Sequence, residues 1–329
     1  MKKNIVLHID NLSHTYDGHK NILYNLNIEI ARGEIVALVG PSGCGKSTLL
    51  RAIVGTHPPT EGSVIVYKGQ DKQNPEIVTK PTRDCGIVYQ RYSLFPNLTA
   101  RQNVAIGLMF DETQLNHRIL GFLPHYLQKR RKKISWWNLK KIHLDEAAEM
   151  LKKVKLGYAM DRYPHQLSGG ESQRVAIAQA LIMKPSVMLL DEPFGALDEA
   201  TRESLQMMLL ELYAENVKAA RENRLPHYTM IIVTHELSEA VLVGDRVLGL
   251  SQYWDHLSES DKNATGSATI VYDKKSPVFL PQDVKSQMDF SKQIEEIRNA
   301  VFDPNILQNR SDFVQFWNEV NKGKAHGVL

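Results

Sequence analysis

The stretch GPSGCGKST at residues 40–48 satisfies G-x-x-x-x-G-K-[ST], the pattern of a phosphate-binding loop. It follows the apolar run EIVALVG and opens the run KSTLLRAIVG, so the local order is strand, loop, helix. Glycines let backbone N–H groups close around phosphates, and a helix beginning near Lys46 directs its positive dipole end at the same anion. This context favours a nucleotide site over a chance glycine-rich turn, with Lys46 at the β- and γ-phosphates and the Ser47 hydroxyl on Mg²⁺. The predicted nucleotide-binding residues of this loop are Gly40, Pro41, Ser42, Gly43, Cys44, Gly45, Lys46, Ser47 and Thr48.

The composition is that of an ordinary globular protein. The chain has 329 residues, of which 43% are hydrophobic and 23% charged, enough for one large domain or two modest ones. A net charge of +3 does not by itself indicate a nucleic-acid partner. Two scattered cysteines, Cys44 and Cys85, suit a reducing cytosol. The N-terminus does not read as a signal peptide, and no apolar run reaches the roughly 18 residues of a membrane span, so we expect a soluble protein.

Further apolar runs predict a buried, mostly parallel sheet. The runs are GSVIVYKG (62–69), CGIVYQ (85–90), SVMLLDEP (186–193) and YTMIIVTHE (228–236). Runs that are apolar on both faces are typical of parallel strands covered by helices, and alternating strands and helices predict an α/β fold. The chain between the second and third of these runs favours helix. We therefore expect a helical subdomain, about residues 91–165, inserted into the α/β core.

Polar residues follow three of these runs. Asp191 ends an apolar run, where it is expected to complete the Mg²⁺ shell, and Glu192 is then placed to polarise an attacking water. The alternative is that both carboxylates only cap a strand end or the next helix. His235 and Gln90 follow other runs in the same way, although each of them alone is more often a loop or core residue.

The stretch LSGGESQ at residues 167–173 predicts a second helix start suited to an anion. Ser168 and Glu171 form the S-x-x-E capping box, which by itself indicates only a well-capped helix. Gly169 and Gly170 occupy its first turn, where glycine is costly unless the backbone must approach something closely. Because the stretch lies beyond the helical subdomain, we expect it to bind the γ-phosphate of another chain, which implies a head-to-tail pair.

Together, GPSGCGKST, Gln90, LSGGESQ, VMLLDEP, GALD and His235 resemble the ATP-binding cassette (ABC) ATPases over about residues 5–250. The resemblance implies a P-loop NTPase core with a mostly parallel sheet, an N-terminal antiparallel β region and the inserted helical subdomain. It implies that Tyr16 stacks on adenine and that Gln90 contacts Mg²⁺ and the lytic water. It also implies that Glu192 is the catalytic base, that His235 senses the γ-phosphate, and that Asp198 belongs to the loop crossing the dimer.

The resemblance extends, more weakly, to the ATPases of nitrate, sulfonate and taurine importers. It implies ATP and Mg²⁺ as ligands, a homodimer or a heterodimer with a second cassette, permease subunits and a periplasmic or lipid-anchored solute-binding protein, with no nucleic acid. It implies a peripheral location on the cytoplasmic face of the inner membrane. Two segments depart from the family: an extra basic and aromatic segment near residues 110–137, and a C-terminal extension over residues 251–329.

Each departure leaves alternatives open, and those for the extension are a regulatory element, a further dimer contact or a cover for an apolar face. Lys129, Arg130, Arg131, Lys132 and Lys133 lie beside Trp136 and Trp137. They suit either anionic lipid headgroups or an acidic permease loop, or else a solvated charged helix whose tryptophans pack on the body. In the extension, helical spacing predicts one short helix through Phe290, Ile294, Ile297 and Val301. A second, with Ser311 as its N-cap, would run through Phe313, Phe316, Trp317 and Val320.

Other functions are weaker matches. The main alternative is a cassette ATPase without a transporter, acting on nucleic acid or in cofactor assembly. Family members that act on nucleic acid usually hold two cassettes in one chain or a long coiled-coil insertion, whereas this sequence shows one cassette and no heptad run. Exporter ATPases are often fused to membrane helices, and a P-loop kinase would leave LSGGE and His235 unexplained.

Overall fold

The computed structural model describes residues 4–18, 20–68, 75–91, 94–112, 136–256, 264–276 and 287–308. The chain divides into two compact units. The core unit contains residues 1–90, 185–195 and 203–329, and the helical unit contains residues 91–184 and 196–202. The inserted helical subdomain was expected to end near residue 165, whereas the helical unit continues to residue 184.

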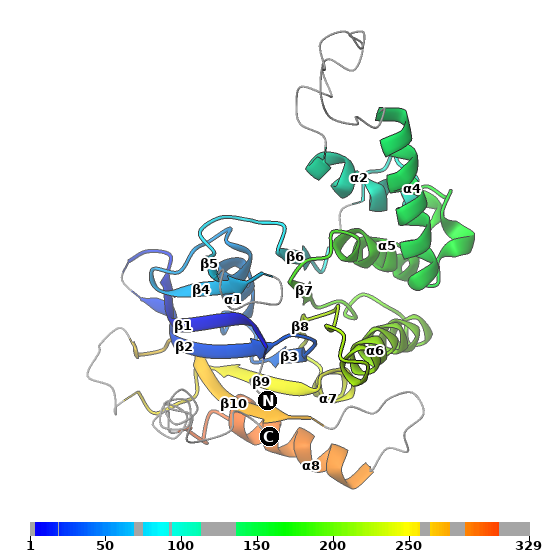
Figure 1. Cartoon of the computed structure of the whole chain (residues 1–329). Helices are drawn as coiled ribbons and strands as arrows, with labels where there is room; N and C mark the ends of the chain where they lie inside the picture. Colours follow the sequence, from blue (N-terminus) through cyan, green and yellow to red (C-terminus); the bar gives the residue numbers. More distant parts are fainter. Residues whose placement is uncertain are drawn as a thin grey trace. The chain divides into compact units, whose positions relative to one another are not determined.

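A six-stranded sheet with the order β10-β9-β3-β8-β7-β6 forms the centre of the core unit (Figure 1). Its strands are β3 (Ile35–Val39), β6 (Cys85–Val88), β7 (Val187–Asp191), β8 (Met230–Val233), β9 (Arg246–Ser251) and β10 (Thr269–Lys275). All neighbours pair in parallel except β10, which pairs with β9 in antiparallel. Every residue of β3 and β8 is buried, which explains why these strands read as continuous apolar runs. The mostly parallel sheet predicted from the sequence is confirmed.

An antiparallel sheet with the order β2-β1-β4-β5 lies in the same unit. Its strands are β1 (Ile5–Thr15), β2 (Asn21–Ala31), β4 (Glu61–Tyr67) and β5 (Pro75–Ile77). The expected N-terminal antiparallel region is therefore present.

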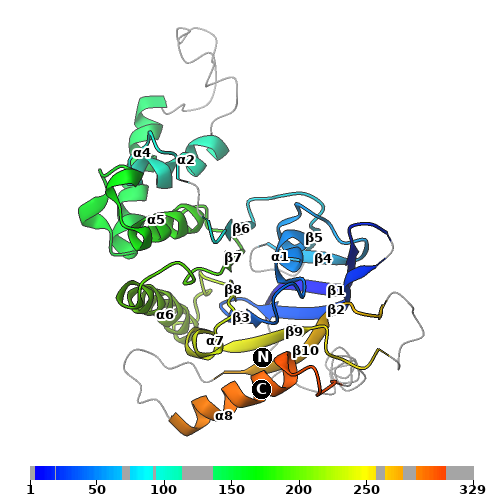
Figure 2. The ribbon, with the colours of Figure 1, turned by 180° about the vertical axis from the view of Figure 1, so that it is seen from behind.

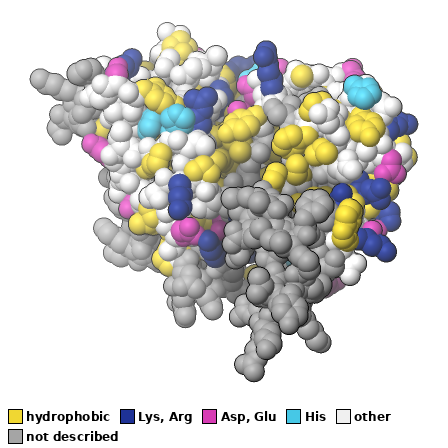
Figure 3. Space-filling model, turned by 90° about the horizontal axis from the view of Figure 1, so that it is seen from above, with side chains coloured by type: hydrophobic (Ala, Val, Ile, Leu, Met, Phe, Trp, Pro, Cys, Tyr) yellow, Lys and Arg dark blue, Asp and Glu magenta, His cyan; other side chains and the backbone are white. Residues whose placement is uncertain are grey.

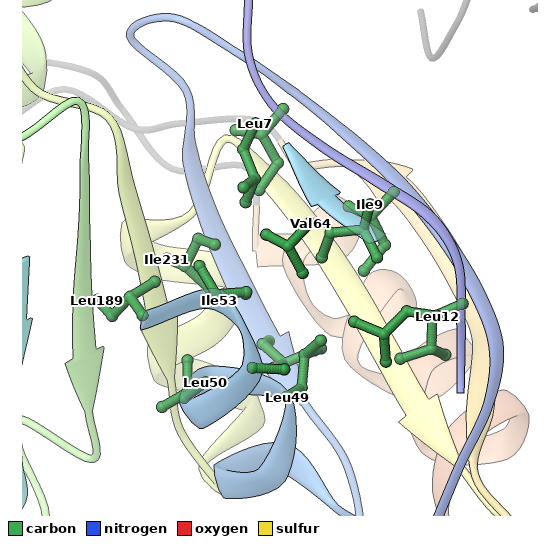
Figure 4. Close-up of a cluster of buried hydrophobic side chains, with 14 of the residues drawn as sticks. Leu7, Ile9, Leu12, Leu49, Leu50, Ile53, Val64, Leu189 and Ile231 are labelled. Atoms are coloured by element: carbon green, nitrogen blue, oxygen red, sulfur yellow. The ribbon is translucent and has the colours of Figure 1, made fainter. Parts of the chain in front are cut away.

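Helix α1 (Lys46–Val54) lies between the two sheets of the core unit. Figure 4 shows its side chains Leu49, Leu50 and Ile53 among residues of both sheets. On one side are Leu7 and Val64 of the antiparallel sheet, and on the other are residues of β7 and β8. All belong to one cluster of buried side chains, so the helix that follows the phosphate-binding loop is anchored on two faces.

The C-terminal part of the chain packs on the core unit. Helix α8 (Gln287–Ile297) continues into a π-helical turn, η6 (Arg298–Phe302), and together they lie along β9, β10 and α7 (Leu237–Val243) (Figures 1 and 2). Ile297 and Val301 are fully buried there, at the spacing predicted for the first tail helix. Strand β10 was not expected in the extension, because only its first half is apolar. The second predicted tail helix lies outside the described residues.

The helical unit contains α2 (Ala100–Glu112), α4 (Trp136–Lys153), the short turns η2 (Gly157–Ala159) and η3 (Pro164–Gln166), and α5 (Gly169–Leu181). Helix α2 contacts both α4 and α5. Its start is set by Thr99 and Gln102, which exchange side-chain to backbone hydrogen bonds as a capping box. Helix α6 (Glu199–Arg221) begins in this unit and continues in the core unit.

Some surface features bear on the expected membrane association. The basic residues 129–133 lie outside the described part of the chain, while Trp137 is described and 72% exposed. Within the described residues, no helix combines the length and the apolar character that crossing a membrane requires. On the face seen in Figure 3, hydrophobic side chains are interspersed with acidic and basic ones.

Candidate nucleotide site

The loop between β3 and α1 takes a route that only glycine allows. A Cβ atom at Gly40 would lie 2.2 Å from the carbonyl oxygen of Leu250 and 2.8 Å from Sγ of Cys44. Gly45, the N-cap of α1, has φ 104°, in the left-handed region that favours glycine. No side chain of the described loop caps α1, so its first N–H groups point towards the loop. This backbone fits a phosphate group.

Lys46 is held inside the loop. Its Nζ donates to the carbonyl oxygens of Gly40 at 2.7 Å and Pro41 at 2.9 Å, and the residue is 9% exposed. Ser47 follows it with an exposed side chain. A lysine ammonium group and a hydroxyl at the start of a helix are the groups that a nucleotide with bound Mg²⁺ requires, so the residues present fit these ligands.

Cys44 is buried in the same loop, and its thiol contacts the Leu250 carbonyl oxygen at 3.4 Å. Burial raises the pKa of the Cys44 thiol, against the opposing effect of Lys46. The thiol is therefore a packing group and not a reactive one.

Three neighbouring parallel strands deliver the predicted catalytic residues to one edge of the sheet. Residues 190 and 88 pair between β7 and β6, and Asp191 pairs with Val233 between β7 and β8. The residues that follow these strands therefore emerge together at their carboxyl ends.

Burial raises the pKa of Asp191, and Glu192 raises it further, whereas Lys46 lowers it. A carboxylate whose charged form is disfavoured in this way gains from a nearby cation, which fits the predicted Mg²⁺ shell.

Glu192 has an unusual backbone conformation and a side chain with two partners. Its φ is 46°, in the left-handed region that glutamate rarely adopts. Its backbone N–H donates to Val233 at 3.0 Å, which holds this conformation. Its Oε2 accepts a hydrogen bond from Nε2 of Gln90 at 2.8 Å, and its Oε1 lies 3.6 Å from Nδ1 of His235. The structure thus brings the three predicted catalytic residues together, with Gln90 and His235 on either oxygen of the Glu192 carboxylate.

The turn that carries His235 is organised by residues the sequence analysis missed. The buried Thr234 hydroxyl donates to Oε2 of Glu239 at 2.6 Å and accepts from the backbone N–H of Glu236 at 3.1 Å. These bonds leave the His235 side chain 54% exposed at the edge of the sheet. Thr234 directly before the histidine and Glu239 four residues after it were the available signal, but their pairing depends on how the chain turns into α7.

Tyr16 lies against the start of α1. Its hydroxyl is 3.3 Å from Oγ1 of Thr48, and the residue is 51% exposed. The rings of His14 and His57 meet its ring edge-on, with centroid distances of 4.8 and 5.8 Å. The tyrosine that the family resemblance selected therefore lies beside the phosphate-binding loop, with a ring orientation set by two histidines. Its role with adenine stays a prediction.

In the helical unit, the second predicted anion site is a capped helix start. Ser168 is the N-cap of α5, its Oγ accepts from the backbone N–H of Glu171 at 3.2 Å, and Oε2 of Glu171 accepts from the Ser168 N–H at 2.7 Å. A Cβ atom at Gly170 would lie 1.9 Å from Cγ2 of Thr201, so this glycine is required by packing within the chain. Gly169 is exposed at the helix start. The contact of these residues with another chain's nucleotide stays a prediction.

Asp198 caps α6. Its two carboxylate oxygens accept from the backbone N–H and the hydroxyl of Thr201, at 3.0 and 2.7 Å. These bonds lower the pKa of Asp198. Thr201 thus links the loop containing Asp198 to the start of α5, because its methyl group faces Gly170.

The chain belongs to the ABC transporter family, whose sequence model matches residues 23–195. It is 38% identical over 246 residues to the sulfate/thiosulfate import ATP-binding protein CysA of Pseudomonas syringae pv. tomato, covering 75% of this chain and 64% of that protein. It is 42% identical over 229 residues to the bicarbonate transport ATP-binding protein CmpC of Synechococcus elongatus, covering 70% of this chain and 28% of that protein. The chain therefore spans less than two thirds of either relative.

Solved structures of cassettes have the same fold. A dimeric ATP-binding cassette in a post-hydrolysis state, bound to ADP and Pi, aligns with a TM-score of 0.57 and 29% identity, over 83% of this chain and all of that one. These similarities confirm the family that the sequence motifs indicated and the P-loop cassette fold.

Proposed function

We propose that this chain is the ATP-hydrolysing subunit of an importer, acting on a separate membrane permease from the cytoplasmic face of the membrane. The observation that carries the proposal is the Glu192 carboxylate, held between Gln90 and His235 at the edge where the phosphate-binding loop also lies. Such a carboxylate is suited to take a proton from a water that attacks a γ-phosphate. The similarity to CysA, which is named as an import protein, supports import over export.

Each residue of the site has a distinct task in this proposal. The loop N–H groups and Lys46 bind the β- and γ-phosphates, while Ser47, Gln90 and Asp191 hold Mg²⁺, which neutralises phosphate charge when bound. Glu192 accepts the proton of the water, Gln90 orients that carboxylate, and His235 contacts the γ-phosphate. Catalysis then rests mainly on positioning and charge stabilisation.

The active form in this proposal is a head-to-tail dimer, either of two copies or with a second cassette. Ser168, Gly169, Gly170 and Glu171 of one subunit complete the phosphate site of the other, and Asp198 lies in the loop that crosses between them. The dimeric post-hydrolysis cassette among the similar structures supports this arrangement. ATP binding closes the dimer, hydrolysis reopens it, and the helical unit transmits the motion to the permease.

For the transported solute, we propose a small anion delivered by a solute-binding protein. The support is that CysA is a sulfate/thiosulfate protein and CmpC a bicarbonate protein. Nitrate and sulfonates, which the resemblance implied, remain candidates of similar chemistry, and taurine, implied in the same way, is a zwitterion that carries a sulfonate group. Uptake of labelled anions by a strain with and without this gene would separate these candidates.

The variant Glu192→Gln tests the catalytic proposal. It keeps the shape of the side chain but removes the proton acceptor. We expect unchanged ATP affinity, turnover lowered by about a hundredfold or more, and a closed dimer that accumulates with ATP in size-exclusion chromatography. Hydrolysis at the parent rate would show that Glu192 is not the base.

A cassette ATPase without a transporter is the second candidate. Co-purification of a permease with the tagged chain supports the importer. Repeated isolation from membranes without any permease would instead favour this alternative.

A further inference from the structure

Tyr158 makes a directed polar contact that its exposure would not suggest. It belongs to the turn η2 between α4 and α5, and 68% of its surface is exposed. Its hydroxyl nevertheless donates to Oε1 of Glu171 at 2.8 Å. An exposed ring gains little from burial, so the hydrogen bond to a carboxylate is its most informative contact.

This bond acts on the carboxylate that caps the phosphate-binding turn of α5. The other carboxylate oxygen of Glu171 accepts from the backbone N–H of Ser168, and Nη1 of Arg162 lies 3.6 Å from Oε1. Arg162 also lies over the Tyr158 ring, 5.5 Å from its centroid. Both oxygens of Glu171 are therefore engaged by groups of its own chain.

The cap determines what the Ser168 hydroxyl can do. A serine hydroxyl has one proton to donate and lone pairs with which to accept. Oγ of Ser168 accepts from the Glu171 N–H at 3.2 Å, and a hydrogen bond from the Ser168 side chain to the Glu171 carboxylate also lowers the pKa of Glu171, so the cap fixes where the hydroxyl lies. A hydroxyl held in a fixed position at a helix N-terminus is suited to a phosphate oxygen.

We propose that Tyr158 is a positioning residue for this turn: it holds Glu171 in the cap, and the cap orients the Ser168 hydroxyl towards a phosphate. Glu171 then acts on the nucleotide through Ser168 and not as a direct ligand. The inference rests on the proposed function, because the phosphate belongs to the nucleotide of the partner cassette.

Titration of Glu171 provides a readout that loss of packing would not move. The backbone hydrogen bond from Ser168 is the main cause that lowers the pKa of Glu171, and the hydrogen bond from Tyr158 and the charge of Arg162 lower it further, against burial. Arg174 is the other charged group that acts on Tyr158, besides Glu171 and Arg162. Removing only the Tyr158 hydroxyl should therefore raise the pKa of Glu171 while the Ser168 bond persists.

The first experiment measures that pKa in the full chain. Glutamate labelled with ¹³C at the carboxyl group is titrated by NMR, and the Glu171 signal is assigned by its loss in Glu171→Gln. We expect Tyr158→Phe to shift the midpoint to higher pH. Tyr163→Phe is the matched control, since its ring stacks on His165 in the same segment, 5.9 Å between centroids, and should leave the midpoint unchanged. An unchanged midpoint in Tyr158→Phe would overturn the proposal.

The second experiment measures steady-state ATP hydrolysis. We expect Tyr158→Phe to lower kcat/KM by about five- to tenfold, the effect of one typical intramolecular hydrogen bond, while ATP binding to the dilute, monomeric chain is unchanged. The double variant Tyr158→Phe/Glu171→Ala should be no worse than Glu171→Ala alone, since both changes remove one interaction.

A failure of the positioning role of Tyr158 and a failure of the proposed ATPase function would give different results. Independent, additive losses in the double variant would show that Tyr158 does not act through Glu171. If the parent chain does not hydrolyse ATP under any condition, the proposed function fails, and the NMR titration still decides whether Tyr158 controls Glu171.

Discussion

The side-chain amide of Gln90 donates a hydrogen bond to the carboxylate of Glu192 at 2.8 Å, across 102 residues of sequence. The two residues come just after β6 and β7, which pair in parallel, so their backbones emerge side by side. The positive φ of Glu192 and the proximity of His235 complete the arrangement. Strained backbone held by a surrounding network is common where a side chain must be aimed at a substrate.

Replacing Gln90 tests this relationship. In Gln90→Ala the Glu192 carboxylate loses the hydrogen bond from the Gln90 amide, and its orientation is no longer defined. We expect kcat for ATP hydrolysis to fall by about ten- to a hundredfold, because general base catalysis depends on geometry. ATP affinity, measured by isothermal titration calorimetry, should change little. Parent-like kcat would contradict the assigned role.

Gly40 tests the path of the phosphate-binding loop. A methyl group at Gly40 would lie 2.2 Å from a backbone oxygen, so Gly40→Ala must displace the loop. We expect ATP affinity to fall by about a hundredfold, as measured by calorimetry, because a displacement near 1 Å disrupts a preorganised site. Gly18→Ala is the control, since φ there is 76° with nothing within 4 Å of the added carbon. It should cost about 1–2 kcal/mol of folding stability at most and leave ATP affinity unchanged. Equal affinity losses in both variants would show that local contact at Gly40 is not the cause.

The tail strand β10 should contribute to the stability of the core unit through Arg246 and Asp273. Their side chains are 4% and 2% exposed and form an ion pair with an N–O distance of 2.6 Å between β9 and β10. Arg246→Ala leaves the buried Asp273 without this partner, so we expect a loss of about 3–5 kcal/mol in the free energy of unfolding by urea. Arg246→Met/Asp273→Leu removes both charges and should be considerably less destabilising. If the single and double variants are equally unstable, the ion pair is not the origin of the effect.

A buried carboxyl group should make stability fall as the pH rises. Burial, and next the charge of Glu34, raise the pKa of Asp245 to about 7, while the Ile35 N–H and Arg246 act in the opposite direction. The ordinary pKa of aspartate is about 3.9. Between these values the folded state binds more protons than the unfolded state, so this group makes the folded state less stable with increasing pH, by at most about 1.4 kcal/mol per pH unit.

Asp245→Asn removes this titration and can still accept the Ile35 N–H, which donates to Oδ1 of Asp245 at 3.1 Å. Urea unfolding from pH 4.5 to 8 should therefore give a flatter pH dependence in the variant than in the parent. The same slope in both proteins would assign the pH dependence to other groups.

Much of the site could be predicted because its signals are local. The spacing of Gly40, Gly45, Lys46 and Ser47 encodes a loop and the helix start beside it, and the apolar runs before Asp191 and His235 encode buried strands. The parallel order of those strands then implies that residues at their carboxyl ends meet. The capping box of Ser168 and Glu171 is equally local, because its bonds span three residues.

Other features depend on residues far apart in the chain. Only the first half of β10 is apolar, and its place beside β9 depends on the Arg246–Asp273 pair and on the packing of α8 and η6. Tyr158 has no motif around it, and its bond to Glu171 exists because η2 brings the two together. Likewise the contact of Tyr16 with Thr48 requires the antiparallel sheet to pack on α1.

By itself, the sequence determined the family, the phosphate-binding loop, the parallel strands and the residues at their ends, because each is written in short-range spacing and hydrophobicity. Only the tertiary structure decided which of those residues touch, that Glu192 adopts a left-handed backbone between Gln90 and His235, and that part of the tail completes the central sheet. These outcomes follow from packing and hydrogen bonding between distant segments, and no local pattern specifies them.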